Sequence, residues 1–143
     1  MVIYHAIRGV DEADNPDQTS GELVRLIGAN CHTVVADNEL AERYSRHLKK
    51  LLSVPSLLYK STEFMWEVIY NSSKFVVEAS LPLELLPGVR VPREDEYVVR
   101  AALTSHPIIV TAEKRVLRDV NAQPVLGLKA VTPAEALELA KDT

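Results

Sequence analysis

Acidic residues at three places in the chain are candidate ligands for a divalent cation. Asp95 opens the segment 93–105, Glu113 follows the apolar run 107–110 directly, and Glu42 lies early in the segment after Asp37. Mg²⁺ and Mn²⁺ take carboxylate oxygens from different elements, with water filling the other positions. Such a cation polarises a phosphodiester and generates the hydroxide that attacks it. If the fold brings the three carboxylates together, they predict a metal-dependent nuclease site.

The same residues also have a simpler explanation. All three lie near predicted helix N-termini, where the helix macrodipole stabilises an anion. Acidic residues are common in first helical turns for this reason alone. The spacing by itself therefore leaves a metal site and a set of helix-stabilising charges both open.

The elements that must position these residues alternate between strand and helix. Strands are predicted at Val2–Ile7, where the pattern also allows a short helix, at Cys31–Ala36, at Pro107–Val110 and within Val125–Val131. Helices are predicted from Thr19 to Ile27, from Asp37 or Asn38 to Leu52, and over Ser61–Asn71, Arg93–Ser105, Ala112–Val120 and Thr132–Lys141, while Lys74–Leu86 fits either state. This alternation predicts an α/β fold with three α/β/α layers around a central, mostly parallel sheet.

Two of these helices have the sequence pattern of a capping box. Thr19 is followed three residues later by Glu22, and Thr132 by Glu135, with Pro133 at the first helical position. Both boxes are expected to form.

Composition predicts one ordinary globular domain spanning residues 1–143. The chain has 47% hydrophobic and 25% charged residues, and its formal net charge is −4. This charge gives no global attraction for nucleic acid, although a local basic patch is compatible with it. One cysteine, Cys31, excludes an internal disulfide framework and indicates a reducing, cytoplasmic location. We see no signal peptide and no apolar run long enough for a membrane span.

Several segments resemble the PIN domain, a family of small α/β metal-dependent nucleases. Val34–Tyr44 looks like its second strand and the helix that carries a family acidic residue, with Glu42 at that place. The segment from Asp95 to Ala102 looks like the family's acidic helix start, and Ile108–Glu113 like its strand ending in Thr, any residue, Asp. Gly127–Glu135 resembles the closing strand and the Thr-Pro helix start. The resemblance implies an endoribonuclease in which Glu42, Asp95 and Glu113 are the catalytic residues and bind Mg²⁺ or Mn²⁺.

The chain departs from the family at its start, where the first strand ends in an Asp that is a principal metal ligand. If Val2–Tyr4 is that strand, His5 stands at the Asp position. In the alternative alignment, Val2–Gly9 comes just after the Asp and the start of the chain is missing. Either way one ligand is lost, and only Asp11 or Asp14 offers a replacement from the following loop. Glu113, where Asp is usual, also displaces a carboxylate by one methylene. The resemblance thus implies a degenerate member with weak activity or none.

Two hypotheses about partners follow. PIN-like nucleases are often the toxin halves of toxin–antitoxin pairs, so RNA and an antitoxin or other protein are the expected partners. The alternative is an inactive PIN-like module that binds RNA or a protein and forms a homodimer through apolar helices. The residues that could form the dimer surface are Phe64, Met65, Trp66, Ile69 and Tyr70, and those that could follow an RNA backbone are Arg43, Arg46, His47, Lys49 and Lys50. Core packing explains most of the first set, and an ordinary solvated helix face explains the second.

Overall fold

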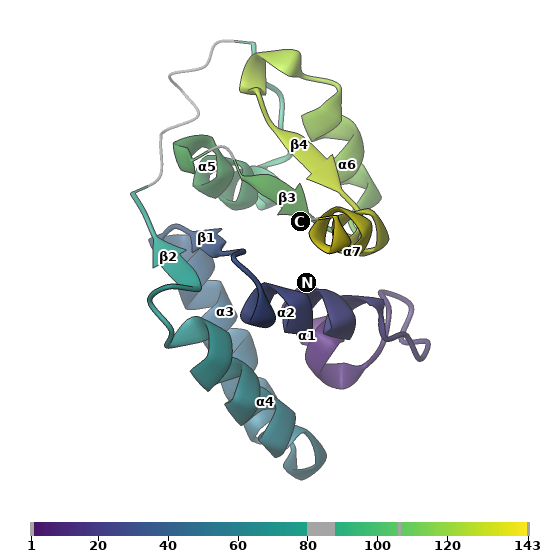
Figure 1. Cartoon of the computed structure of the whole chain (residues 1–143). Coiled ribbons are helices and arrows are strands. Elements are labelled where there is room, and N and C mark those ends of the chain that lie inside the picture. Colours follow the sequence, from purple (N-terminus) through teal and green to yellow (C-terminus); the bar gives the residue numbers. More distant parts are fainter. Residues whose placement is uncertain (1, 80–87, 106, 143) are drawn as a thin grey trace.

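The computed structural model describes residues 2–79, 88–105 and 107–142. Figure 1 shows helices surrounding short strands. The helices are α1 (Val2–Arg8), α2 (Thr19–Ala29), α3 (Asn38–Leu52), α4 (Leu58–Phe64), α5 (Glu96–Ser105), α6 (Lys114–Asn121) and α7 (Pro133–Lys141). The strands are β1 (Val34–Ala36), β2 (Phe75–Val77), β3 (Ile108–Val110) and β4 (Lys129–Val131). The shorter turns of helix are 3₁₀ at Pro55–Leu57, Arg93–Asp95 and Pro124–Leu126, and a π-helix at Met65–Ile69.

The predicted first strand is wrong, because Val2–Arg8 forms helix α1. A short apolar run does not distinguish a strand from a buried helix by its pattern alone. Gly9 marks the C-terminal end of this helix. Its φ is 68°, and its N–H donates to the carbonyl of His5 at 2.8 Å. A glycine in the left-handed region is a common helix C-cap. Helix α1 packs against α2 and buries Ile7.

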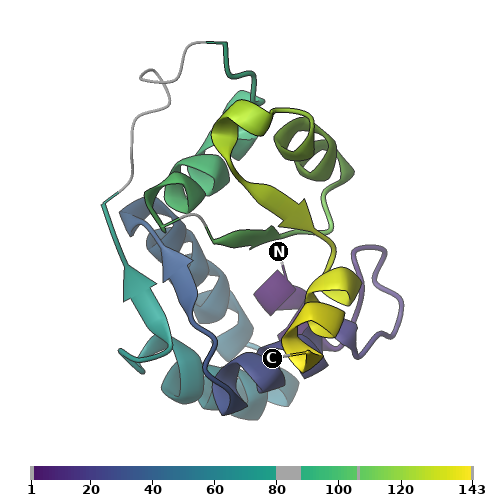
Figure 2. The same cartoon turned by 45° about the horizontal axis from the view of Figure 1, so that its top comes forward.

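The strands are all parallel, but those described form two separate pairs. In one sheet β1 pairs with β2, Val34 opposite Phe75; in the other β3 pairs with β4, Ile108 opposite Lys129. Figure 2 shows the two pairs lying apart in the molecule. A mixed α/β fold with parallel pairing is thus confirmed. The ambiguous segment contains strand β2, and its part from residue 80 on lies outside the described residues.

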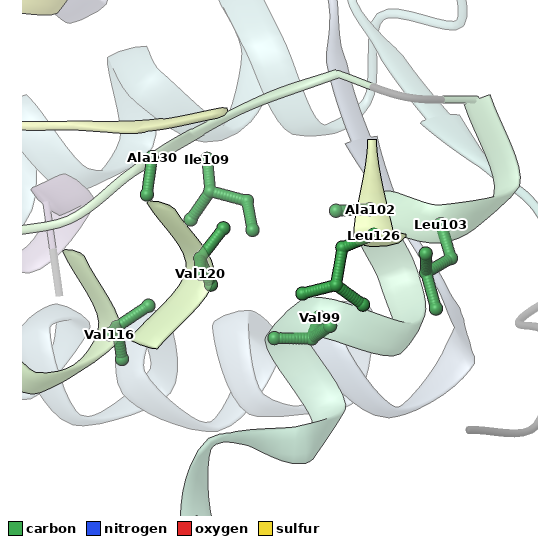
Figure 3. Packing of buried hydrophobic residues seen from close by; sticks show 8 residues of the cluster. All are labelled: Val99, Ala102, Leu103, Ile109, Val116, Val120, Leu126 and Ala130. Atoms are coloured by element: carbon green, nitrogen blue, oxygen red, sulfur yellow. The ribbon is translucent and has the colours of Figure 1, made fainter. Parts of the chain in front are cut away.

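Three clusters of buried side chains hold the elements together. The first lies between α5, β3, α6 and β4 (Figure 3) and consists of Val99, Ala102, Leu103, Ile109, Val116, Val120, Leu126 and Ala130. The second joins α1, α3 and α4 around Ile7, Leu48 and Val68. The third joins α2 to α7 around Leu23 and Leu137. Helix α5 contacts both β1 and β3, so it connects the two sheets.

Side-chain caps set the starts of helices α3 and α7. The Asp37 carboxylate accepts from the backbone N–H of Leu40 at 2.8 Å and caps α3, as expected. Thr132 and Glu135 form the predicted capping box of α7. The other predicted box does not form, since the N-cap of α2 is Gln18 without a side-chain cap. Within the described residues, no helix has both the length and the apolar character needed to cross a bilayer.

Candidate functional site

Asp95 is the most enclosed of the three predicted ligands. It ends the 3₁₀ turn before α5, where its backbone N–H donates to the carbonyl of Pro92 at 2.9 Å. Only 16% of its side chain is exposed. Its Oδ2 atom is buried and has no hydrogen-bond partner, although Nη2 of Arg115 lies 3.6 Å away. A buried carboxylate oxygen without a hydrogen bond is costly unless a cation compensates it.

The charges around Asp95 act in opposite directions. Burial raises its pKa above the ordinary value of 3.8, and the carboxylates of Glu94 and Glu113 act in the same direction. The guanidinium of Arg115 opposes them. Arg115 also pairs with the exposed Glu94, whose own backbone N–H and then Arg115 lower the pKa of that carboxyl. Burial outweighs the arginine at Asp95, so this carboxylate is held in an environment that disfavours its charge.

Glu113 is the second carboxylate that the sequence predicted for this region. It stands just past β3 at the N-cap position of α6. Its backbone N–H donates to Oγ1 of Thr111 at 3.0 Å, and its own side chain makes no capping hydrogen bond. It is near enough to raise the pKa of Asp95. The charge of Glu113, just past β3, therefore acts on Asp95 in the turn before α5.

Glu42 points elsewhere. It lies on α3 with 68% of its side chain exposed, and its Oε1 is 3.3 Å from Nη2 of Arg46, one helical turn further on. In the part of the chain that the structure describes, no group of three or more Asp, Glu, His or Cys side chains is placed to hold a metal ion. Mg²⁺ commonly keeps several waters and binds through one or two protein carboxylates together with substrate phosphates. Asp95 and Glu113 supply the type of ligand that such a minimal site uses.

The front of the chain supplies no further ligand to this pair. His5 is half-buried on α1, and burial is the largest cause that lowers its pKa. The prediction that His5 ends a strand is therefore wrong, because His5 lies within helix α1. Asp11 accepts from two backbone N–H groups of its own loop, and Asp14 pairs with Arg8 at 2.8 Å.

A cluster that the sequence did not reveal lies between α3 and α5. The carboxylate of Glu39 accepts from Arg43 at 3.1 Å and from Arg100 at 2.8 Å. The guanidinium of Arg43 also lies over the ring of Tyr97, 3.9 Å from its centroid. The i, i+4 spacing of Glu39 and Arg43 was visible in the sequence. Nothing local indicated that Arg100 joins them.

The proposed apolar dimer surface divides into buried and exposed members. Phe64 is a core residue, whereas Trp66 and Tyr70 are 70% and 62% exposed. The rings of these two aromatic residues are 5.5 Å apart, centroid to centroid. Tyr59 on α4 is also largely exposed. This pattern leaves an aromatic surface on the outer side of the segment 58–70.

No family model, curated protein or solved structure matches this chain.

Proposed function

We propose that the protein is a weak, PIN-like endoribonuclease that depends on Mg²⁺ or Mn²⁺. One observation carries this proposal: the buried Oδ2 of Asp95 has no hydrogen bond. The charge of Glu113 also acts on this carboxyl and raises its pKa. Both residues occur at the positions that the family resemblance assigns to metal ligands. The proposal includes the PIN-like architecture, with both parallel strand pairs in one central layer between helices. The contacts of α5 with β1 and β3 support this arrangement.

The chain's own residues would divide the work in a definite way. A bound ion would supply Lewis-acid activation of the scissile phosphate and of a water molecule. Asp95 would hold the ion most firmly, because binding relieves the cost of its buried charge. Glu113, whose side chain is exposed, would add a second oxygen ligand. Glu42 could bind the ion only after its ion pair with Arg46 breaks, which is consistent with weak activity.

The deciding experiment is cleavage of a single-stranded RNA by the wild type and by Asp95→Asn, each with Mn²⁺, Mg²⁺ or EDTA. We expect slow cleavage by the wild type with either ion and none in EDTA or in the variant. Asp119→Asn is a matched control, because Asp119 is another largely enclosed carboxylate but pairs with Arg118. Metal-independent cleavage, or equal rates for wild type and Asp95→Asn, would contradict the proposal.

A second candidate function is favoured by the exposed aromatic rings. In this case the protein is an inactive PIN-like module, and Arg115 permanently supplies the positive charge beside Asp95. Trp66 and Tyr70 then belong to a binding surface, with a second copy of the chain as its occupant. Both signs of charge border this surface. The exposed acidic residues are Glu63 and Glu67, and the exposed basic residues are Lys60 on α4 and Arg46, Lys49 and Lys50 on neighbouring α3. A two-fold axis along α4 would place acidic and basic borders against each other.

The two candidates differ in a direct measurement of metal binding. Mn²⁺ broadens NMR signals of nuclei close to it, so a nuclease site predicts selective broadening near Asp95 and Glu113 that the Asp95→Asn variant lacks. An inactive module predicts no selective broadening. In a toxin–antitoxin role, an antitoxin would be a further partner of either form.

A further inference from the structure

Two arginines from different helices are fixed against one carboxylate beside the candidate site. Arg43 of α3 and Arg100 of α5 each donate from Nη2 to a separate oxygen of Glu39. The guanidinium of Arg43 stacks on the ring of Tyr97. Stacking and ion pairing hold both side chains in place before any ligand arrives, which lowers the entropic cost of binding one.

The hydrogen bonds of this cluster leave donors unused. A guanidinium carries five N–H donors. Among the described residues, Arg43 and Arg100 donate only from Nη2, and the Nε atom of each is buried without a partner. Neither Nη1 atom is among the buried unpartnered atoms, and neither donates to Glu39. Nη1 of each arginine is therefore the donor atom left for a ligand.

The cluster also carries excess positive charge. Two guanidinium groups share one carboxylate, and the side chains of all three residues are 34% to 41% exposed. A ligand that completes the cluster should therefore be an oxyanion that can accept from two planar forks. Phosphate fits this geometry, and arginine binds it in bidentate fashion.

We propose that Arg43 and Arg100 bind a backbone phosphate of single-stranded RNA. The pair lies between α3 and α5, where α3 carries Glu42 and Tyr97 follows Asp95 by two residues. The inference rests on the proposed function for its choice of RNA, but it concerns binding rather than cleavage.

The test is metal-free binding of a fluorescently labelled, single-stranded RNA, measured by anisotropy in EDTA at several salt concentrations. The test variant is Arg43→Gln/Arg100→Gln. The control is Arg25→Gln/Arg118→Gln, which removes the same charge from exposed positions on α2 and α6. We expect the test variant to lose about tenfold in affinity and the slope of log K against log salt to fall by about 1, as expected for losing one to two phosphate contacts. The control should bind nearly as the wild type does.

A third variant separates binding from folding. Arg43→Lys/Arg100→Lys keeps both charges but removes the planar forks, and thermal unfolding of every variant shows whether it is folded. Partial recovery of affinity in this variant supports a phosphate site. Wild-type affinity in a folded Arg43→Gln/Arg100→Gln variant would overturn the proposal. The ion pairs of Glu39 would then only link α3 to α5.

Two further arms identify the ligand and separate this inference from the nuclease proposal. Inorganic phosphate should compete only at far higher concentration than RNA; competition at equal concentration would overturn the assignment to RNA. Asp95→Asn should keep metal-free binding while losing cleavage. If no protein cleaves RNA but binding still depends on Arg43 and Arg100, the nuclease proposal fails and the phosphate site stands.

Discussion

Arg115 lies opposite Asp95 but donates no hydrogen bond to the buried Oδ2 of this carboxylate. Nη2 of Arg115 lies 3.6 Å from Oδ2 of Asp95, within ion-pair range but too far for a hydrogen bond, and Oδ2 is buried. Arg115 also pairs with Glu94, so its charge is divided between two carboxylates. This shared contact leaves Asp95 with an unfavourable charge that a divalent ion could stabilise better.

The raised pKa of Asp95 predicts how a neutral replacement changes stability with pH. The ionised form of Asp95 is disfavoured in the folded state, so it lowers the free energy of unfolding. This cost is absent below about pH 3.8, because the carboxyl is then protonated in both the folded and the unfolded state. This cost grows as pH rises above about 3.8 and is complete above the folded-state pKa. Asp95→Asn should therefore be more stable than the wild type in urea unfolding at pH 7, and the difference should disappear at pH 3. Saturating Mn²⁺ should reverse the order at pH 7, because only the wild type gains an ion. A less stable variant at pH 7 without metal would contradict this account.

Removing Arg115 should raise the pKa of Asp95 further. Arg115 is the group that lowers this pKa, through its charge and its contact with the carboxyl, and burial remains when it is lost. Titration of the Asp95 side-chain carbonyl carbon by NMR in Arg115→Gln measures the change. Arg118→Gln is the control, since that guanidinium pairs with Asp119. An unchanged or lower Asp95 pKa in Arg115→Gln would show that the contact is not made in solution.

The two predicted capping boxes should respond differently to the same substitution. Glu135 accepts from the backbone N–H of Thr132 at 2.9 Å, and Thr132 in turn accepts from the N–H of Glu135. At α2 the helix begins at Thr19 itself, and it is Asp17 that accepts from the Thr19 N–H. Glu135→Ala should cost about 0.5–1 kcal/mol of unfolding free energy. Glu22→Ala should change it by less than about 0.5 kcal/mol, because the surface glutamate has no capping bond to lose. Chemical denaturation of both variants provides the comparison.

The phenol of Tyr44 should lose its proton at a higher pH than an ordinary tyrosine does. Burial, with a smaller effect from Tyr97, raises the pKa of its phenol from 10 to about 12. The Tyr44 ring packs edge-on against Phe75, with centroids 6.1 Å apart. Its raised pKa means that the unfolded chain releases this proton first, so Tyr44 favours unfolding as pH rises from 10 toward 12. Ultraviolet difference titration should show a component near 12 that Tyr44→Phe lacks; a complete titration by pH 11 in the folded protein would refute it.

The sequence predicted those features that depend on neighbouring residues. Asp37 caps α3 because a carboxylate three residues before an N–H is a local arrangement, and the parallel strands follow from short apolar runs between helices. Helix α1 was missed because its apolar run was read without the glycine that ends it. Glu42 was placed on the correct helix, but Arg46, four residues on, determines the direction of its side chain. Contacts between distant elements, such as Glu39 with Arg100, depend on packing that no local pattern records.

Trp66 offers a test of the aromatic surface as a contact between copies. It is the chain's only tryptophan, so its fluorescence reports whether this surface is covered. If a second copy covers it, raising the protein concentration should shift the emission to shorter wavelength, as light scattering records the change from monomer to dimer. Trp66→Glu should remain monomeric, because a buried carboxylate without a partner is costly at an apolar interface.

Leu139→Glu is the matched control for that change. Leu139 is a partly exposed apolar residue on α7, away from the segment that carries Trp66, so this variant should dimerise as the wild type does. Charge reversal then tests the orientation. Glu63→Lys and Lys49→Glu should each weaken the dimer, whereas the double variant should recover part of the affinity by restoring opposite charges across the two-fold axis. A wild type that remains monomeric at all concentrations, with unshifted emission, would remove the second copy as the occupant and favour the monomeric nuclease.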